Sequence, residues 1–279
     1  MSEQKHTGKV IFAGAGPGDP ELITLKALRY LQQADVVITD RLVSDVILDE
    51  YVHKEALILP VGKQCRKGAS TPQSVINELL VEYASQNKLV VRLKGGDPSV
   101  FSNILDELQA LSRHGIPYEI IPGITAALGA AAYSGIPLTA RDHSKAVRLL
   151  TYYKKDLLED SYWKELALTD DTLVFYMSSD TLDSLVSVLL KHGIGADKYL
   201  SVIEQATTPY QQVYNCNIHD YPAKWGNSRY ISPSLIIIGK TAGLYEEFQW
   251  IGNGEKKGES KESYFKPVAD NPITQTKRA

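Results

Sequence analysis

Cysteine, long apolar runs and an excess of charge of either sign are scarce or absent in this 279-residue sequence. Only Cys65 and Cys216 occur, and neither belongs to a CxxC motif, so we expect no cysteine-based metal site or redox pair. No apolar run approaches the roughly 18 residues that span a bilayer. The first seven residues are polar, which argues against a signal peptide. These absences predict a cytoplasmic protein with reduced thiols and no membrane partner.

The charge balance narrows the class of ligand. Lys and Arg number 30 against 33 Asp and Glu, for a formal net charge of -3. Such a chain has no overall positive field to gather nucleic acid, and an anionic ligand would need a local group of Lys and Arg. Hydrophobic residues make up 43% of the chain and charged residues 23%, the balance of a globular protein with a substantial core. We expect no bound metal and no nucleic-acid partner.

The first half of the chain alternates short apolar runs with helical patterns. The predicted strands are residues 9–13, 36–39, 56–61, 89–93 and 118–121. The predicted helices are residues 21–34, 72–85 and 104–114. This alternation indicates a largely parallel sheet covered by helices.

A second α/β region follows the Ser134-Gly135-Ile136-Pro137 break. Its predicted strands are residues 146–152, 173–177, 199–204 and 235–238, with a helix over 180–192. We therefore expect an N-terminal α/β domain over 1–140 and a C-terminal α/β domain over 141–251. Residues 252–279 have no core pattern and are predicted to form a disordered tail.

Glycine-rich loops follow two of the predicted strands. Gly14 to Gly18 reads GxGxG, which lacks the third glycine of the dinucleotide-binding GxGxxG pattern. Asp19 stands where a helix N-cap belongs and Pro20 at the first helical position, and Asp97 and Pro98 repeat this arrangement. A capping carboxylate occupies the amide donors that a phosphate would need, so both loops are unsuited to pyrophosphate.

Two interpretations of these loops remain open from the residues alone. Glycine lets a ligand approach the backbone closely, and nearby carboxylates favour a cation or hydroxyl donors. S-adenosylmethionine has a sulfonium, an ammonium and ribose hydroxyls but no phosphate, so it suits such a site. Alternatively, the glycines only make tight turns and the carboxylates only cap helices.

A series of longer motifs narrows the choice. The sequence contains, in this order, GAGPGDP (14–20), ADVV (34–37), DRLVS (40–44), VGK (61–63), VRLKGGDP (91–98), IPGITAA (121–127) and SGIPLT (134–139). Looser matches follow at LVFYM (173–177) and SPSLIIIG (232–239). With these motifs, residues 8–244 resemble the uroporphyrinogen-III C-methyltransferases of the tetrapyrrole methylase family.

The resemblance implies a fold and a set of site residues. It implies two α/β domains with the active site in a cleft between them, a fold distinct from the Rossmann methyltransferases, and a homodimer. Asp40 would be the proton acceptor and Lys63 the proton donor, with Arg141 near the substrate. The methyl donor, S-adenosylmethionine, would contact Pro17, Gly95, Gly96, Asp97, Val100, Thr125, Ala126, Met177 and Ala206. A reduced pyrrole carbon is a nucleophile, and a carboxylate can take up the proton that the ring releases.

The chain departs from the family pattern around the substrate. The family stretch Phe-Gly-Arg-Gly-x-Glu-Glu is Phe101 to Glu107 here, so the substrate-site arginine becomes Asn103 and a family glutamate becomes Asp106. A neutral amide cannot replace a guanidinium that binds carboxylate with two parallel hydrogen bonds. Thr-His-Arg has become residues 139–141, Thr-Ala-Arg, and Thr-Gly-His has become residues 151–153, Thr-Tyr-Tyr. Donor binding is thus better supported than the identity of the acceptor, although Asn103, Asp106 and Arg141 remain the expected substrate residues.

Three functions are consistent with this sequence. The first is methylation of uroporphyrinogen III by S-adenosylmethionine, twice, through precorrin-1 to precorrin-2, for sirohaem or cobalamin. The second is methylation of another precorrin or a related acceptor on the same scaffold. The third is a non-catalytic S-adenosylmethionine-binding module, which the loss of the substrate arginine suggests and the retention of Asp40, Lys63 and Arg141 opposes.

Overall fold

The computed structural model describes residues 8–62, 71–153, 159–251 and 263–265, and within it the chain divides into two compact units. The first unit runs to Thr125 and the second begins at Ala126. Each unit has its own sheet and its own buried core. The expectation of two α/β domains is therefore met. None of the helices in the described ranges is both long and apolar enough to cross a membrane.

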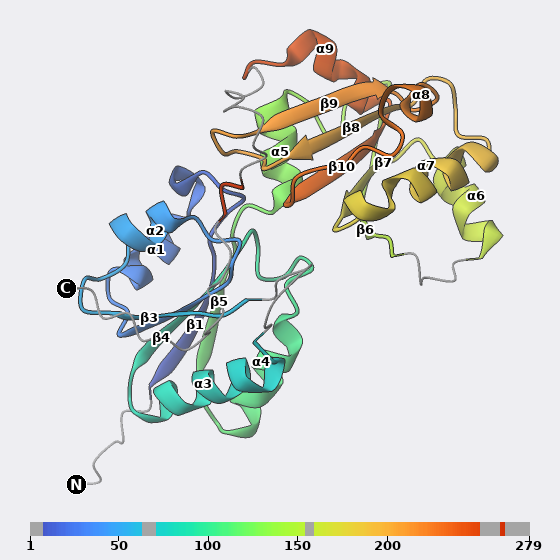
Figure 1. Ribbon diagram of the computed structural model, residues 1–279. Helices are drawn as coiled ribbons and strands as arrows, with labels where there is room; N and C mark the ends of the chain where they lie inside the picture. The colour runs from blue at the N-terminus through green and yellow to red at the C-terminus, as the bar shows by residue number, and fades with distance from the viewer. Residues whose placement is uncertain (1–7, 63–70, 154–158, 252–262, 266–279) are drawn as a thin grey trace, which may run out of the picture. The chain divides into compact units, whose positions relative to one another are not determined.

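The first unit contains a five-stranded parallel sheet in the order β3-β2-β4-β1-β5 (Figure 1). Its strands are β1 (Lys9–Gly14), β2 (Val36–Thr39), β3 (Leu57–Pro60), β4 (Leu89–Lys94) and β5 (Tyr118–Ile121). Its helices are the 3₁₀ helix η1 (Pro20–Leu22) and α1 (Leu25–Leu31), α2 (Asp45–Glu50), α3 (Gln73–Ser85) and α4 (Ile104–Arg113). Near-continuous apolar runs such as that of β2, buried at every position, are typical of parallel strands covered on both faces.

Helices cover the two faces of this sheet separately. Apolar residues of α1 and α2 pack with Ile11, Val37 and Val91 on one face. Those of α3 and α4 pack with Val10, Ile38 and other strand residues on the opposite face. Figure 1 shows these two helix pairs on opposite sides of the strands. The crossover that leaves β4 therefore lies on the face opposite to the crossovers that leave β1 and β2.

The second unit is built on a mixed sheet in the order β6-β7-β10-β8-β9. Only β6 and β7 run parallel, and the other neighbours are antiparallel. Its strands are β6 (Val147–Thr151), β7 (Thr172–Tyr176), β8 (Tyr199–Glu204), β9 (Gln212–Asn217) and β10 (Ser234–Gly239). Its helices are α5 (Ala126–Ser134), α6 (Asp160–Leu168), η2 (Ser179–Thr181), α7 (Leu182–Lys191), α8 (Tyr221–Trp225), η3 (Thr241–Leu244) and α9 (Tyr245–Phe248).

The cores explain where the chain divides. Ala127, Ala130 and Ala131 of α5 belong to a buried cluster with Ile203 and Ile237 of the second sheet. The boundary therefore precedes α5, whereas the sequence placed it after residue 140. The Ser-Gly-Ile-Pro segment at residues 134–137 ends α5 and does not separate the two units. Of the predicted tail, only residues 263–265 are described, and the rest lies outside the described residues.

One predicted helix is divided in two. The pattern over 21–34 predicted a single helix, but the structure has η1 followed by α1. Thr24 caps the second segment, because its Oγ1 accepts a hydrogen bond from the Ala27 amide at 3.2 Å. The leucine spacing continues across this interruption, which is why periodicity did not reveal it. The short helices α2, α5, α6, α8 and α9 and the strand β9 were also not predicted.

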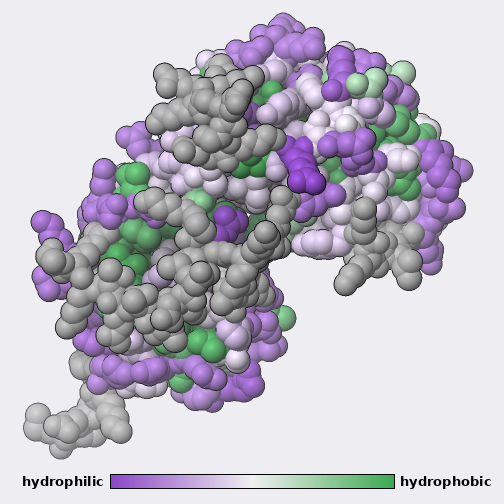
Figure 2. Space-filling view, viewed as in Figure 1, coloured by the Kyte–Doolittle hydropathy of each residue, from purple (hydrophilic) through white to green (hydrophobic). Residues whose placement is uncertain are grey.

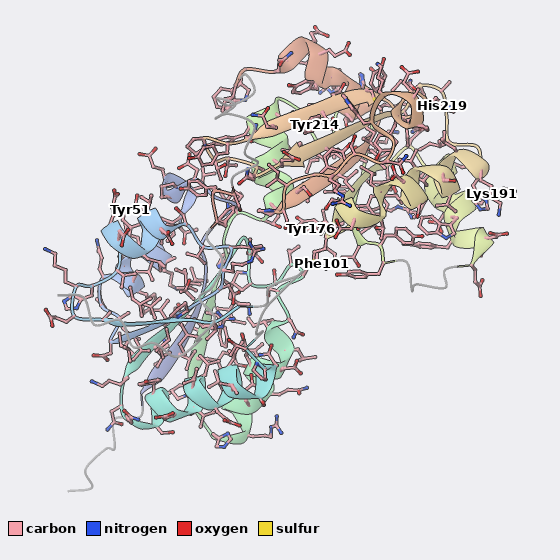
Figure 3. The ribbon with its side chains drawn as sticks, viewed as in Figure 1. Tyr51, Phe101, Tyr176, Lys191, Tyr214 and His219 are labelled. Carbon is pink, nitrogen blue, oxygen red and sulfur yellow. The ribbon has the colours of Figure 1, made fainter. Side chains whose placement is uncertain are left out.

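The visible surface is mainly polar, as expected for units that bury their apolar side chains internally. Purple and pale residues dominate Figure 2, and the hydrophobic areas are small. Large apolar side chains that stay exposed include Phe101 and Met177, which both follow strands. Phe101, labelled in Figure 3, lies in the loop between β4 and α4.

Candidate functional site

The topology of the first sheet indicates where a ligand would bind. In open parallel sheets, ligands bind beyond the carboxyl ends of strands, where neighbouring strands send their crossovers to opposite faces. Strand β4 meets this condition with both of its neighbours, β1 and β2. Gly14 is the last residue of β1, and the loops that follow β2 and β4 begin with Asp40 and Gly95. The fold thus brings the glycine-rich motifs and Asp40 to one edge.

Glycine backbone allows the end of β1 to touch the loops after β4 and β5. A Cβ on Gly14 would lie 2.6 Å from the Gly123 Cα and 2.6 Å from the Gly96 carbonyl oxygen. Gly123 is equally confined, since its Cβ would lie 2.3 Å from the same oxygen. The amide of Gly96 donates to the Gly16 carbonyl at 2.8 Å, which holds the β4 loop against the β1 loop. No side chain larger than hydrogen fits at these points, so the requirement for glycine is steric.

Asp97 joins the β4 loop to the β5 loop. Its Oδ2 accepts a hydrogen bond from the Gly123 amide at 2.8 Å, and its Oδ1 accepts from the Ser99 amide at 2.7 Å and from the Ser99 hydroxyl. The expectation that Asp97 caps a helix is wrong, because α4 begins only at Ile104. Asp19, by contrast, does cap η1 through a 2.8 Å bond from the Glu21 amide. The two Gly-Asp-Pro motifs therefore have different roles.

Asp40 follows β2 at the same edge and contacts a buried arginine. Its Oδ1 lies 2.5 Å from Arg92 Nη2, and the side chains of Asp40 and Arg92 are 29% and 2% exposed. Arg92 Nε also donates to Glu107 at 3.0 Å, and Lys94 Nζ lies 3.1 Å from the second Glu107 oxygen. Neither Arg92 nor Glu107 was predicted from the sequence as a site residue. A charged residue inside an otherwise apolar, parallel strand was the available signal, because buried charges are normally paired.

The charges in this cluster act on one another. Burial lowers the pKa of the Arg92 guanidinium, but the negative charges of Asp40 and Glu107 outweigh it and raise that pKa overall. Burial lowers the pKa of the Lys94 ammonium, and the positive charge of Arg92 lowers it further. Glu107 is therefore the shared counter-ion of two buried cations, while Asp40 is the partly exposed end of the cluster.

The loop that replaces the family substrate motif is strained. Phe101 and Asn103 both have left-handed backbones, with φ of 50° and 54°. Asn103 Nδ2 donates to Asp106 Oδ2 at 3.3 Å and to Gln73 Oε1 at 3.4 Å. The two predicted substrate residues of this unit therefore contact each other.

Three predicted donor residues of the first unit lie at one edge of the sheet. They are Pro17, Val100 and Thr125, in the loops after β1, β4 and β5. Lys63 lies outside the described residues.

The second unit groups its predicted donor residues at one edge as well. Met177 and Ala206 follow β7 and β8, which both run antiparallel to the intervening β10 and so end on the same side. The amide of Ala127, next to Ala126, donates to Tyr176 Oη at 3.0 Å, which fixes the start of α5 at this edge (Figure 3). Met177 has φ of 53° and is 54% exposed, and its sulfur accepts a hydrogen bond from the Tyr153 hydroxyl at 3.4 Å.

The remaining predicted substrate residue lies in a turn of the second unit. Arg141, together with Thr139 and Lys145, lines a shallow hollow there. The turn is closed by paired backbone hydrogen bonds between Ala140 and Ser144, at 3.1 and 3.0 Å. Asp142 lines the same hollow, so its two basic side chains face one acidic side chain and leave a single excess positive charge for a carboxylate ligand.

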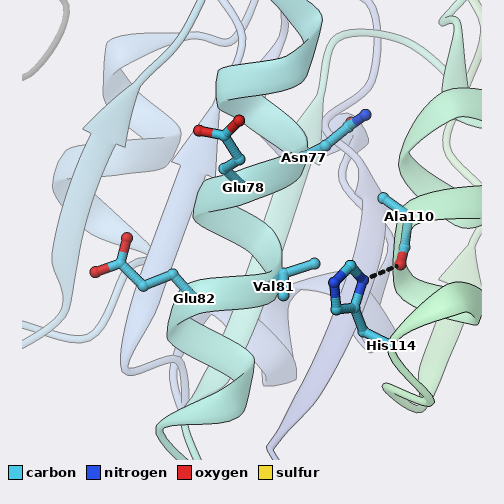
Figure 4. Close-up of a pocket in the computed structure, with 6 residues that line it drawn as sticks. All are labelled: Asn77, Glu78, Val81, Glu82, Ala110 and His114. Atoms are coloured by element: carbon cyan, nitrogen blue, oxygen red, sulfur yellow. Dashed lines mark hydrogen bonds between the residues drawn. The ribbon is translucent and has the colours of Figure 1, made fainter.

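Other features of the chain are less suited to be the site. The groove in Figure 4 lies between α3 and α4, lined by Asn77, Glu78, Val81, Glu82, Ala110 and His114. It adjoins the end of α4, which points away from the carboxyl edge. Burial raises the pKa of the Cys216 thiol to about 11, so this residue is not a nucleophile at neutral pH. The described residues hold no group of three or more His, Cys, Asp or Glu side chains that could bind a metal.

Comparison with known proteins decides the family. The sequence pattern of the Tetrapyrrole (Corrin/Porphyrin) Methylases matches residues 9–222. The chain belongs to the tetrapyrrole methylase family. It is 43% identical over 248 residues to the siroheme synthase of Vesicomyosocius okutanii, covering 89% of this chain and 53% of that protein. The chain thus spans about half the length of the curated relatives it matches.

Solved structures confirm the tetrapyrrole methylase fold. Uroporphyrin-III C-methyl transferase from Thermus thermophilus, complexed with S-adenyl homocysteine, matches with a TM-score of 0.70 and 32% identity over 85% of this chain and 94% of that one. The cobalamin biosynthetic enzyme cobalt precorrin-4 methyltransferase matches with a TM-score of 0.75 and 27% identity over 87% of this chain and 98% of that one. The fold class and the family inferred from the motifs are confirmed.

The glycine contact predicts a steric effect on stability. Gly123→Ala should lower the free energy of unfolding by about 1–3 kcal/mol, because its methyl group meets only backbone atoms. Gly195→Ala is the matched control, since its Cβ would lie 2.7 Å from Asp197 Oδ1, the tip of a side chain that can rotate. Calorimetric unfolding of both variants tests the difference, and equal losses would contradict the steric argument.

The two Gly-Asp-Pro motifs provide a second comparison. Asp97→Asn should destabilise the protein by about 1–3 kcal/mol, because an amide NH₂ would face the donors of Gly123 or Ser99. Asp19→Asn should change stability little, since asparagine caps helices as well as aspartate does. Thermal unfolding followed by circular dichroism measures both, and a neutral Asp97→Asn would show that Asp97 does not hold the loops together.

Proposed function

We propose that this chain transfers methyl groups from S-adenosylmethionine to carbon atoms of uroporphyrinogen III, twice, through precorrin-1 to precorrin-2. The observation that carries the proposal is the position of the Asp40 carboxylate, anchored at one oxygen beside the glycine loops of the same sheet edge. The likeness to a uroporphyrin-III C-methyl transferase complexed with S-adenyl homocysteine supports the same donor, because that ligand is what the donor leaves after transfer.

The residues at the two edges fit such a donor. The Gly95 and Gly96 backbone is partly exposed and free of side chains, so a ligand can lie directly against it. The Asp97 carboxylate is occupied by Gly123 and Ser99, so it shapes this loop while the backbone contacts the ligand. Met177, Ala206 and Ala126 are the apolar residues of the second unit to which the family resemblance assigns donor contacts. Pro17, Val100 and Thr125 complete the proposed donor site.

The chain's own groups account for the proton balance. The sulfonium supplies an electrophilic methyl group, and a pyrrole carbon forms the new bond as the carbon–sulfur bond breaks. Asp40 would then accept the proton that the alkylated ring releases, and its partial exposure lets it reach a substrate. Lys63 would be the proton donor. Arg141 with Lys145 would bind acidic side chains of the tetrapyrrole. Asn103 and Asp106, which contact each other in the first unit, are the other proposed substrate residues.

A second acceptor remains a defined alternative. The similarity to cobalt precorrin-4 methyltransferase shows that the same fold accompanies a different tetrapyrrole substrate. Asn103 in place of the family arginine would remove one carboxylate-binding group, which favours an acceptor held with fewer ion pairs. The pathway, sirohaem or cobalamin, follows from which acceptor is methylated. The proposed homodimer can be tested independently by light scattering.

The direct test is the mass of the product. Purified protein incubated without oxygen with uroporphyrinogen III and S-adenosylmethionine should yield a product heavier by two methyl groups. A single added methyl group would contradict the second transfer. No product, with donor binding intact by calorimetry, would assign the chain to another acceptor or to a non-catalytic role.

Asp40→Asn should lower turnover by about 10²-fold or more, because it removes the proton acceptor.

Asp35→Asn is the matched control for Asp40→Asn. Asp35 precedes β2, at the opposite end of the same strand, and its carboxylate accepts a hydrogen bond from the Leu89 amide at 2.7 Å. Asparagine can still accept this bond, so turnover should stay at the wild-type value. Unchanged turnover in Asp40→Asn would remove the role proposed for that carboxylate.

The missing arginine can be restored. If uroporphyrinogen III is the acceptor, Asn103→Arg should lower its KM by about tenfold, the gain expected from one charge-assisted hydrogen bond. Asn87→Arg is the control, because Asn87 has the same left-handed backbone, with φ of 62°, at the end of α3. Steady-state kinetics with both variants decides the question. An unchanged KM in Asn103→Arg would favour the alternative acceptor.

A further inference from the structure

Arg92 is the only link in the described structure between Asp40 and the buried charges behind it. Its guanidinium donates to Asp40 Oδ1 through Nη2 at 2.5 Å and to Glu107 Oε1 through Nε at 3.0 Å. Its Nη1 donates to the Ile38 and Leu93 carbonyls at 3.3 and 3.4 Å. All three nitrogens are therefore engaged, and a planar group held at three points has one orientation.

This arrangement orients the Asp40 carboxylate. Arg92 holds Oδ1 from the buried side, whereas among the described residues no hydrogen bond involves Oδ2. The Asp40 amide donates to the Leu93 carbonyl at 3.1 Å, which ties the backbone to the neighbouring strand. One oxygen is thus fixed, and the other stays available to a substrate. A catalytic group whose far side is held by a third residue is the usual design of a positioned base.

Stability alone does not explain why these charges are buried. Removing charges from water is costly, and well-packed apolar side chains often replace a buried ion cluster without loss of stability. Glu107 and Lys94 extend the cluster further into the core, where their side chains are 1% and 3% exposed. The cluster ends at one partly exposed group, Asp40. Orienting that carboxylate is therefore a role that stability does not require and that the cluster can fulfil.

We propose that Arg92 is a positioning residue for methyl transfer, which holds the Asp40 carboxylate in its reactive orientation while Glu107 fixes the guanidinium. This inference rests on the proposed function, because it assigns Asp40 the proton-accepting role. Glu107 Oε1 also receives a 3.5 Å hydrogen bond from Gln73, whose own Oε1 accepts from Asn103. The same anchor therefore supports both Asp40 and the loop expected to contact the substrate.

Arg92→Lys tests the proposal. A lysine keeps the positive charge but cannot hold two carboxylates and two carbonyls at fixed angles. We expect kcat to fall by about 10²-fold, as for other misplaced catalytic groups, while the donor dissociation constant and the KM values change less than about twofold. Arg148→Lys is the matched control, because Arg148 also joins two carboxylates, Glu165 at 2.5 Å and Asp171 at 2.6 Å. Its kcat should stay at the wild-type value.

The double variant separates positioning from general loosening. If Arg92 acts through Asp40, adding Arg92→Lys to Asp40→Asn should lower kcat no further than Asp40→Asn alone. The proposal would be overturned if the loss of kcat in the double variant equalled the product of the losses in the two single variants. It would also be overturned by a kcat within twofold of wild type in Arg92→Lys. Should Arg92→Lys fail to fold, Glu107→Gln replaces it: this variant keeps the shape and an acceptor oxygen, should also lower kcat, and should likewise add nothing to Asp40→Asn.

A crystal structure of the folded variant, Arg92→Lys or Glu107→Gln, distinguishes failure of this inference from failure of the proposed function. If the wild-type chain does not methylate uroporphyrinogen III, the proposed function fails, yet the orientation of Asp40 can still be observed. A carboxylate displaced by more than about 0.5 Å relative to wild type would support positioning. An unmoved carboxylate would overturn it, whatever the activity.

Discussion

Three glycine backbones meet at the carboxyl edge of the first sheet, and the arrangement of the site depends on this contact. Gly14 ends β1, whereas Gly96 and Gly123 lie in the loops after its two neighbours, β4 and β5. A methyl group on Gly14 or Gly123 would overlap backbone atoms of the others. The contact brings the β4 loop against the β1 and β5 loops, and the Asp97 carboxylate closes it from the side. The glycines therefore leave bare backbone at the edge of the sheet where the strand order predicts ligand binding.

Behind this edge, a buried cluster of charged side chains also positions residues of the site, but by hydrogen bonds. The glycine loops are positioned by steric exclusion, whereas Asp40 accepts a charge-assisted hydrogen bond from Arg92. Glu107 connects this charge cluster to the loop that contains Asn103. It accepts hydrogen bonds from Arg92 and from Gln73, and Gln73 in turn accepts one from Asn103. A change in the loop that contains Asn103 can therefore reach Asp40 through polar contacts. In this chain the loop differs from the family pattern, and Arg92 and Glu107 are paired.

The regular elements could largely be predicted, and the local geometry of the loops could not. All the strands expected in the first unit are present, because parallel strands buried on both faces produce recognisable apolar runs. The interruption at Thr24 was missed, since the leucine spacing is the same on both sides of it. Asp97 was read as a cap because its neighbours match those of Asp19, yet its partners are Gly123 and Ser99. A contact across 26 residues has no local signature.

The sequence by itself determined the family, the α/β class and the residue types at the site, because ordered motifs and apolar periodicity are properties of the chain alone. Only the tertiary structure decided which of those residues act together. Arg92 and Glu107 are paired because α4 covers the face of the sheet that carries Val90 and Arg92, and Asp40 joins them because β2 lies beside β4. The domain boundary at Ala126 was likewise decided by packing, since α5 buries its alanines against the second sheet. Such contacts form only once distant segments are packed together.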